Sequence, residues 1–417
     1  MVVGWRIVQL RSDFQRAKKL ARRIWRGRKA ARHLKQLRAE TGPLQNGVYE
    51  IGVYFADSDV NIYQMRQWYG PLQALAKQHP VLLIARNAIG AKTLTEESGL
   101  PVAFAPKISH LETLVGRQPL KVVLYVNQNT RNFQMMRYGR RFHVFINHGE
   151  SDKMYMTSNQ HKAYDFAFVA GDAARERLSK ALWDYDVDER TFTIGRPQTD
   201  HLGGQKPYPD DDRITVLYAP TWEGDRPAAT YGSVRSHGET LVEALLQTGR
   251  HRVIYRPHPR SGVVDPDFGS ANERIIAKLK AANAKDPQAH HIYDTAAHIG
   301  WQLSEPDVAI CDVSAMVYDR LATGKPLMVT RPENPEAEVD ETGYLSQCEW
   351  LSVDQAVNIV AEVERVISDE TARKALTHWS EHYFGDTAQG APTQRFHDAV
   401  AKLFTRWEKR ASQTEAI

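Results

Sequence analysis

The chain has 417 residues and a net charge of +4, with 42% hydrophobic and 25% charged residues, a balance typical of a globular protein rather than a disordered or fibrous one. The chain is longer than a single domain with one hydrophobic core usually is, so we expect two domains. It has only two cysteines, Cys311 and Cys348, which excludes a disulfide framework or a paired-cysteine zinc site. No apolar run approaches the roughly 18 residues that a membrane-spanning helix needs, and the N-terminal charges do not fit a signal peptide, so we expect a protein that neither is secreted by that route nor spans a membrane.

A basic arm occupies residues 1–42. It contains 13 Lys and Arg against two acidic residues, so the rest of the chain is mildly acidic. Ser12 and Gln15 have the spacing of a capping box, which predicts the start of a helix. The apolar side chains of this helix fall on one side and the basic ones on the other; the apolar side contains Phe14, Ala17, Leu20, Ala21, Ile24 and Trp25.

A basic amphipathic helix of this kind is typical of proteins that bind an anionic membrane surface. Two alternatives remain, because the apolar side could pack on the chain's own body and the basic side could bind nucleic acid. The acidic body carries no helix-turn-helix, RNA-recognition or zinc-finger pattern, so we expect no nucleic-acid partner. We expect a peripheral protein at the cytoplasmic face of the plasma membrane.

Short apolar runs alternate with helix-length segments from residue 48 onward, and several runs are nearly continuous in Val, Ile, Leu and Tyr. Such strands are buried on both faces in parallel sheets. The predicted strands of the first half are 48–55, 80–85, 121–126, 142–146, 165–169 and 191–194. Those of the second half are 213–219, 251–256, 290–293, 307–311 and 326–330. Predicted helices between the strands include 62–78, 171–183, 237–248 and 314–323.

The two halves are separated by residues 200–212, which are rich in Gly, Pro and charge, as linkers are. We therefore expect an α/β fold with two Rossmann-like domains, at residues 43–205 and 206–385, facing each other across a cleft as in the GT-B architecture. Residues 386–417 are expected to form a C-terminal helix that packs back on the N-terminal domain. Neither half carries a dinucleotide-binding glycine fingerprint or a P-loop, and we expect no cofactor.

The strand predicted at 251–256 ends in Arg256-Pro257-His258-Pro259. Ligands of open α/β sheets bind outside the carboxyl ends of the strands, and the two prolines stiffen the backbone around Arg256 and His258. A guanidinium and an imidazole together offer donors suited to phosphate oxygens. This stretch alone leaves two interpretations, a phosphate site and a surface turn with incidental polar residues.

In the first half, His148 and Gly149 follow the strand predicted at 142–146, and Lys153 comes shortly after them. A histidine with a near-neutral pKa suits a general base, although a single strand-end histidine is also compatible with a structural role. Asp57-Ser58-Asp59 has the form of an Asp-x-Asp metal motif, but capping of the following helix explains it better. We expect no metal site.

In the second half, Thr221 follows the strand predicted at 213–219 and is a candidate donor to a phosphate oxygen, or an ordinary loop residue. Asp312, Ser314 and Asp319 follow the strand at 307–311. Asp312 or Ser314 can cap the next helix, whose free N–H groups bind anions well. Capping without ligand binding is the alternative.

Taken together, these segments resemble the CDP-glycerol glycerophosphotransferase family of teichoic acid synthesis, over roughly residues 140–335. The resemblance rests on five motifs in order, each at a strand end: His148-Gly149 with Lys153; Gly195-Arg196-Pro197-Gln198-Thr199-Asp200; Tyr218-Ala219-Pro220-Thr221-Trp222; Arg256-Pro257-His258-Pro259; and Asp312-Val313-Ser314 with Asp319 and Gly324-Lys325-Pro326. It implies a GT-B fold, attachment to the membrane surface, and transfer of a polyol phosphate from a CDP-linked donor to a lipid-linked polymer acceptor.

The resemblance also implies residue roles. His148 and His258 are the predicted catalytic residues: His148 is the base acting on the acceptor hydroxyl in the N-terminal domain, and His258, with Arg256 and Ser314, holds the donor pyrophosphate in the C-terminal domain. The other predicted substrate-binding residues are Gly149, Lys153, Thr221, Asp312 and Asp319.

The chain departs from the family where Val313 and Ala315 replace a Tyr and a Ser, and where Glu223 replaces a basic residue. These departures leave the donor, glycerol or ribitol, and the acceptor open. A GT-B glycosyltransferase that uses a nucleotide sugar is the first alternative function. A non-catalytic lipid- or nucleic-acid-binding protein on the same fold is the second.

Overall fold

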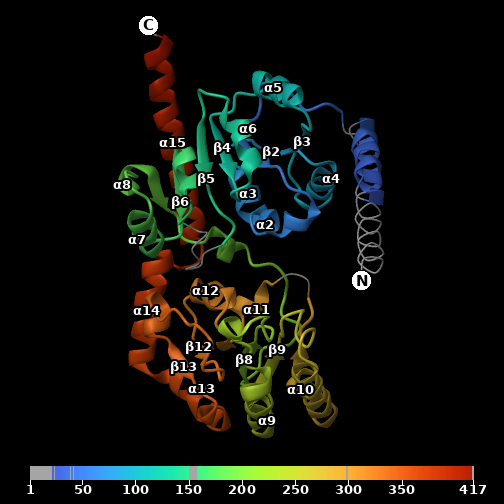
Figure 1. Ribbon diagram of the computed structural model, residues 1–417, viewed down its shortest axis with the longest axis vertical. Helices are drawn as coiled ribbons and strands as arrows, with labels where there is room; N and C mark the ends of the chain where they lie inside the picture. The colour runs from blue at the N-terminus through green and yellow to red at the C-terminus, as the bar shows by residue number, and fades with distance from the viewer. Residues whose placement is uncertain are drawn as a thin grey trace, which may run out of the picture.

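The computed structural model describes residues 21–22, 24–37, 39–40, 42–149, 157–296 and 299–415 (Figure 1). They form two α/β domains, each built on a parallel sheet, which confirms the predicted fold class. The predicted helix start at Ser12 and the candidate Lys153 lie outside the described residues. Within the arm, residues 24–37 are helical.

The N-terminal sheet has seven strands in the order β3-β2-β1-β4-β5-β6-β7, all parallel. Its strands are β1 Ile51–Phe55, β2 Val81–Ala85, β3 Val102–Phe104, β4 Val122–Tyr125, β5 Phe142–Phe145, β6 Phe166–Val169 and β7 Thr191–Thr193. Six of them lie inside the predicted runs. The sequence did not predict β3, which has three residues, although β7, equally short and at the other edge of the sheet, lies inside a predicted run.

The C-terminal sheet has six strands in the order β10-β9-β8-β11-β12-β13, also all parallel. Its strands are β8 Ile214–Ala219, β9 His251–Tyr255, β10 Ile292–Tyr293, β11 Val308–Cys311, β12 Leu327–Thr330 and β13 Glu349–Leu351. The edge strand β13 was again missed. Every residue of β9, β11 and β12 is buried, because helices cover both faces of a sheet wound in this way.

The helices of the N-terminal domain are α2 Ile62–Arg66, α3 Tyr69–Leu75, α4 Ala88–Glu97, α5 Ile108–Arg117, α6 Phe133–Met136, α7 Asp172–Ala181 and α8 Val187–Arg190. Those that follow β8 are α9 Glu239–Gln247, α10 Pro266–Lys285, α11 Trp301–Ser304, α12 Ala315–Leu321, α13 Ile359–Ser368, α14 Glu370–Phe384 and α15 Ala391–Glu415. The single helix predicted at 62–78 is two helices, because Pro71 has no N–H to continue an α-helical ladder.

The last helix, α15, leaves the C-terminal domain and runs beside the N-terminal sheet (Figure 1). Phe396, Val400 and Leu403 of α15 are fully buried in the N-terminal core. The chain turns at Gly385, directly after α14. Its φ there is +67°, a conformation that favours glycine. The C-terminal helix thus ties the end of the chain to the first domain.

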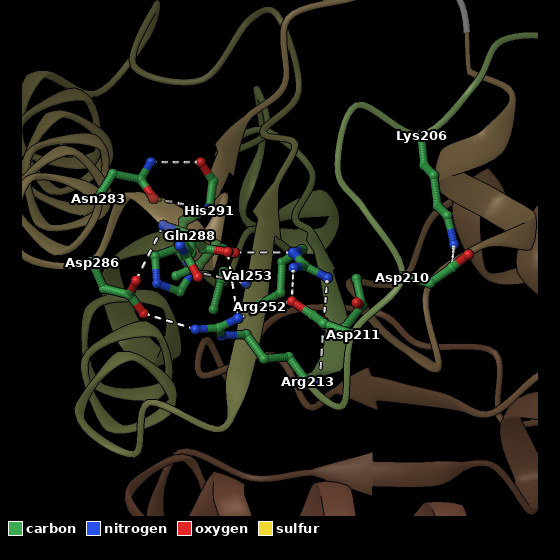
Figure 2. A network of polar contacts seen from close by, with 12 residues as sticks. Lys206, Asp210, Asp211, Arg213, Arg252, Val253, Asn283, Asp286, Gln288 and His291 are labelled. Atoms are coloured by element: carbon green, nitrogen blue, oxygen red, sulfur yellow. Dashed lines mark hydrogen bonds and ion pairs between the residues drawn. The ribbon is translucent and has the colours of Figure 1, made fainter.

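The end of the interdomain linker is fixed to the C-terminal sheet by an ion pair between the buried Arg252 and Asp211, whose side chain is 23% exposed (Figure 2). The Arg252 side chain is 1% exposed and donates to both carboxylate oxygens of Asp211, at 3.1 and 2.5 Å. Arg213 donates to Asp211 and to Asp286, at 2.8 and 2.9 Å. These bonds lower the pKa of Asp211 to about 2, with Arg252 as the largest cause.

We expect Asp211→Asn to lower the free energy of unfolding by about 3 kcal/mol at pH 7, because it leaves the buried Arg252 charge without its partner. Since the folded pKa lies below that of the unfolded chain, this stability is present above about pH 4 and is lost as the pH falls toward 2. Urea unfolding at pH 7 and pH 3 measures both effects. Asp210→Asn is the control, since its side chain is 92% exposed; equal effects of the two variants would contradict the assignment.

Candidate active site

A cavity of about 790 Å³ lies at the carboxyl ends of β8, β9 and β11. Its wall includes five residues that the sequence pointed to: Thr221, Arg256, His258, Ser314 and Asp319. The first four come from three separate strand ends, which meet because β9, β8 and β11 are neighbours in the sheet, and Asp319 comes from helix α12. This is the crevice where open α/β sheets bind ligands; the role of each residue in binding stays a prediction.

The guanidinium of Arg256 is held in a fixed orientation. It donates to the carboxylate of Asp294 at 2.5 Å and to the carbonyl of Ala296 at 2.9 Å. Asp294 is buried and also accepts a bond from Gln302 at 2.9 Å. The sequence did not point to Asp294, because nothing in it shows that the end of β10 lies beside the end of β9. An arginine anchored in this way loses little side-chain entropy when it binds a ligand.

His258 has a defined tautomer. Its Nδ1 accepts a hydrogen bond from the backbone N–H of Arg260 at 3.2 Å, so the neutral ring carries its proton on Nε2. Burial and the nearby Arg260 lower the pKa of His258, which favours this neutral form. The ring therefore offers one N–H donor to a ligand in the cavity, as a phosphate oxygen requires.

Asp312 does not line the cavity but lies beneath its wall, with 0% of its surface exposed. Its carboxylate accepts bonds from Thr221 N at 2.7 Å, Ser233 N at 3.0 Å and Thr330 Oγ1 at 2.6 Å. Burial raises its pKa to about 6, so it is still mainly ionised at pH 7. Asp312 thus joins the strand ends that carry the cavity, and the cap of α12 is Ser314, whose hydroxyl accepts from Met316 N at 3.3 Å.

Glu223, a departure from the family pattern, stabilises the loop that follows His258. It is 7% exposed and accepts bonds from the backbone N–H groups of Gly262, Val264 and Asp265, at 2.9, 2.7 and 3.1 Å. These bonds lower its pKa even though burial acts in the opposite direction. Glu223 therefore fixes the loop that follows His258 instead of facing a ligand.

In the N-terminal domain, His148 lines a second cavity of about 310 Å³ at the carboxyl ends of β1, β4 and β5. Its Nδ1 lies 3.2 Å from the carbonyl oxygen of Val126. A carbonyl only accepts, so Nδ1 carries the proton and Nε2 remains an acceptor. Burial, and secondarily the charge of Arg196, lowers the pKa of His148, and the ring is therefore neutral at pH 7 and able to take a proton.

The backbone before His148 is held in an uncommon conformation. Asn147 has φ +54°, and its side chain donates to the carbonyl of Gly149 at 2.6 Å. The indole of Trp68 donates to the carbonyl of Asn147 at 2.5 Å. Left-handed non-glycine residues persist where the surroundings fix them, and they cluster at functional sites. Gly149 lines a neighbouring cavity and not the one beside His148.

An ion pair joins the two domains near these cavities. Arg196, in the loop after β7, pairs with Asp319 of α12, and both side chains are largely buried at 11% and 19% exposure. Asp319, which was predicted to bind substrate, is thus engaged by the opposite domain. The sequence showed Arg196 only as part of a motif, since nothing in it places residue 196 next to residue 319.

Neither a metal centre nor a bilayer-spanning helix is found in the described residues. No helix there is both long and apolar enough to cross a membrane, and no three His, Cys, Asp or Glu side chains there are grouped to hold a metal ion.

The sequence matches no protein-family model and no curated protein. The structure is similar to the wall teichoic acid polymerase TagF, solved as a variant soaked with CDPG, with a TM-score of 0.56 and 12% identity over 93% of this chain and 99% of that chain. It is also similar to a putative UDP-N-acetylglucosamine 2-epimerase from Listeria monocytogenes, with a TM-score of 0.55 and 13% identity over 86% of this chain and 98% of that chain. At these identities the likeness shows the fold and leaves the substrate open. The chain therefore has the two-domain GT-B fold that its sequence predicted.

Proposed function

We propose that the protein transfers a polyol phosphate, such as glycerol phosphate, from a CDP-linked donor to a hydroxyl of a lipid-linked acceptor in the synthesis of a teichoic-acid-type cell-wall polymer. The observation that carries the proposal is a pair of histidines with opposite tautomers in two cavities. His148 keeps Nε2 as a proton acceptor, and His258 keeps Nε2–H as a donor. A base on one domain and a phosphate-binding donor on the other are what such a transfer needs.

In the proposed mechanism, the acceptor hydroxyl loses its proton to Nε2 of His148 as its oxygen attacks the β-phosphorus of the donor. The bond from that phosphorus to the bridging oxygen breaks, and CMP leaves. The leaving phosphate has a second pKa of about 6 and departs without strong help from an acid. Arg256, His258 and Ser314 supply donors to the negative charge that spreads over the phosphate oxygens.

The fold likeness supports a nucleotide-sugar enzyme almost equally, because the TM-scores to the polymerase and to the epimerase are 0.56 and 0.55. A glycosyltransferase would keep the same pyrophosphate site and attack a sugar carbon instead of phosphorus. Calorimetric titration with CDP-glycerol, CDP-ribitol, UDP-sugars and GDP-sugars separates the two, and we expect the CDP-polyols to bind most tightly. Binding of none of these donors would favour the non-catalytic alternative.

We expect Arg256→Met to weaken CDP-glycerol binding about 10- to 100-fold, since hydrogen bonds to a charged group contribute about 1.5–3 kcal/mol. Arg256→Lys keeps the charge but loses the two-pronged geometry, so an intermediate loss is expected. Arg235→Met is the control, because this exposed arginine pairs only loosely with Asp265, at 3.4 Å. Unchanged affinity in Arg256→Met, measured by calorimetry, would remove Arg256 from the donor site.

We also propose that the basic arm holds the protein on an anionic membrane surface at the cytoplasmic face. In the described part of the arm, Ala30 is 4% exposed, Leu34 packs against the N-terminal core and Arg26 pairs with Asp59 at 2.5 Å. Ile24 and Trp25, in contrast, are 49% and 60% exposed. One side of this helix is thus docked on the body, while its other side offers apolar and basic groups to lipid headgroups.

The variant Ile24→Ser with Trp25→Ser is expected to weaken binding to liposomes that contain an anionic lipid by at least about 10-fold, since each buried apolar side chain contributes about 1.5–3 kcal/mol. Co-sedimentation with liposomes measures this. Trp183→Ser removes an even more exposed tryptophan, at 84%, from a site outside the arm. Equal losses in the two variants would contradict a specific role for the arm.

A further inference from the structure

The cavity beside His148 is lined mainly by carboxamides. Six of its nine lining residues are Asn61, Gln64, Asn127, Gln128, Asn129 and Asn147, and the others are Asp57, Phe145 and His148. A carboxamide has two N–H donors and one acceptor oxygen, and part of this capacity is used within the protein: Asn127 Nδ2 donates to Gln64 Oε1 at 2.7 Å, and Asn147 Nδ2 donates to the carbonyl of Gly149 at 2.6 Å. Such a wall matches a ligand that presents many hydroxyl groups, because each hydroxyl both donates and accepts.

Asp57 has free acceptor capacity in this cavity. Asn129 Nδ2 donates to one of its oxygens at 2.7 Å and Asn127 Nδ2 to the other at 2.9 Å. The amide of Asn129 is itself oriented, since its oxygen accepts from Arg131 N at 2.8 Å. An ionised carboxylate has about four acceptor positions, so about two remain for hydroxyl groups of a ligand. Asp57 therefore does not act as the helix cap that its sequence position suggested, and Ser58 at the cap position makes no side-chain capping bond.

We infer that this cavity binds the acceptor through an uncharged, polyhydroxylated unit, either a sugar or an alditol. Asp57 and the carboxamides form hydrogen bonds with the hydroxyl groups of this unit and hold it beside His148. The inference rests on the proposed function and deepens it, because it names the class of acceptor that reaches the same base. The volume of about 310 Å³ lies at the lower end of the range for small-molecule sites, roughly 300–1,000 Å³, and suits a single such unit.

The charge of the cavity argues against a phosphate as the group of the acceptor that binds there. Among the described residues that line it, Asp57 is ionisable and negative and none is Lys or Arg. Arg196, which acts on the pKa of His148, is engaged by Asp319. A phosphate dianion would meet the Asp57 carboxylate with no Lys or Arg among the described lining residues to offset it, whereas a neutral sugar would meet only hydrogen-bonding groups there.

The test compares two acceptors on the full-length protein with CDP-glycerol as donor. One is an alkyl glycoside, which is neutral, and the other is an alkyl glycerol phosphate with the same chain. CMP release gives kcat and KM for each, and we expect a KM for the glycoside at least about tenfold lower. A lower KM for the phosphate-bearing acceptor would overturn the inference.

Two variants locate the effect in the cavity. Asp57→Asn is expected to raise the KM for the glycoside about tenfold, the effect of losing a hydrogen bond to a charged group, while kcat changes much less. Asn61→Lys is expected to lower the KM for the phosphate-bearing acceptor, since it adds a cation to a wall whose described residues include no Lys or Arg, and it leaves Asp57 unchanged. Asn46→Lys makes the same charge change at an exposed position of the same domain and should leave both KM values unchanged. No change of either KM in Asp57→Asn and Asn61→Lys would also overturn the inference.

Direct binding of the alkyl glycoside separates this inference from the proposed function. If neither acceptor supports CMP release, the transfer proposal fails, and calorimetric titration of the glycoside into the wild type and Asp57→Asn still decides the inference. Binding that weakens about tenfold in the variant supports a polyhydroxyl site, and no detectable binding to the wild type contradicts it. The melting temperature of each variant shows that it is folded at the assay temperature.

Discussion

Replacing His148 with alanine is expected to lower kcat for polyol-phosphate transfer by about 10²- to 10⁴-fold, the usual contribution of a positioned general base. The His148 ring is neutral because burial lowers its pKa, and its Nδ1–H donates to the carbonyl of Val126. Nε2 is then the atom that takes the acceptor's proton. Release of CMP from CDP-glycerol in the presence of a lipid-linked acceptor measures the effect.

The pH profile gives a second readout of the same residue. Since the folded pKa of His148 lies below 6.5, the base is unprotonated at neutral pH, and the acidic limb of kcat/KM should fall below pH 6.5 in the wild type. His110→Ala removes an exposed histidine of the same domain and should leave kcat and the profile unchanged. Wild-type activity in His148→Ala would show that another group is the base.

Replacing Asp312 with alanine is expected to lower the free energy of unfolding by about 3–5 kcal/mol. The change leaves two backbone N–H groups, of Thr221 and Ser233, and the hydroxyl of Thr330 without their acceptor at a site with no solvent exposure. Each buried donor left unpaired costs about 1–3 kcal/mol. Urea unfolding of the purified variant measures the loss.

The matched control is Thr330→Val, which removes one donor and keeps the carboxylate with its two backbone partners. A loss of about 1 kcal/mol is expected, the typical net contribution of one hydrogen bond. Asp312→Ala should also weaken CDP-glycerol binding, because Asp312 holds the backbone of Thr221 at the cavity wall. A stability close to that of the wild type in Asp312→Ala would mean that these three bonds do not hold the strand ends together.

Much of the fold could be read from the sequence because its strands are buried on both faces. β1 and β2, for example, are completely apolar apart from Gly52 and fully buried, so each shows as an uninterrupted run bounded by loops. The edge strands β3 and β13 have three residues each and carry no such signal. Short edge strands are therefore predicted unevenly, since β7 and β10, with three and two residues, do lie inside predicted runs.

The candidate donor site could be located, but its internal contacts could not. Strand-end positions placed Arg256, His258 and Ser314 at one edge of a sheet, and the structure brings them to one cavity. The partner of Arg256 is Asp294, 38 residues away in the chain. Only the order of the strands makes such residues neighbours, and a single sequence does not contain that order.

The departures from the family pattern also show that a single sequence does not reveal contacts between residues that are distant in the chain. Glu223 stands where a basic residue is usual and was one of the departures that left the identity of the donor and the acceptor open. In the structure it accepts three backbone N–H bonds from the loop after His258, so this departure is explained by a structural role. The carboxamide cavity was missed altogether: Asp57, Asn127 and His148 follow three strands, β1, β4 and β5, and the sequence analysis took Asp57 as a helix cap and did not single out Asn127.

The central claim is that a CDP-linked polyol phosphate is the donor, and a transfer assay with a panel of donors tests it most directly. The full-length protein, anionic liposomes and a lipid-linked acceptor are incubated with CDP-glycerol, CDP-ribitol, UDP-sugars or GDP-sugars, and the mass of the acceptor product is measured. The account predicts a product heavier by one polyol phosphate unit, formed with one CMP released for each transfer. A product that gains a sugar from a UDP- or GDP-sugar, with none formed from either CDP-polyol, would contradict it.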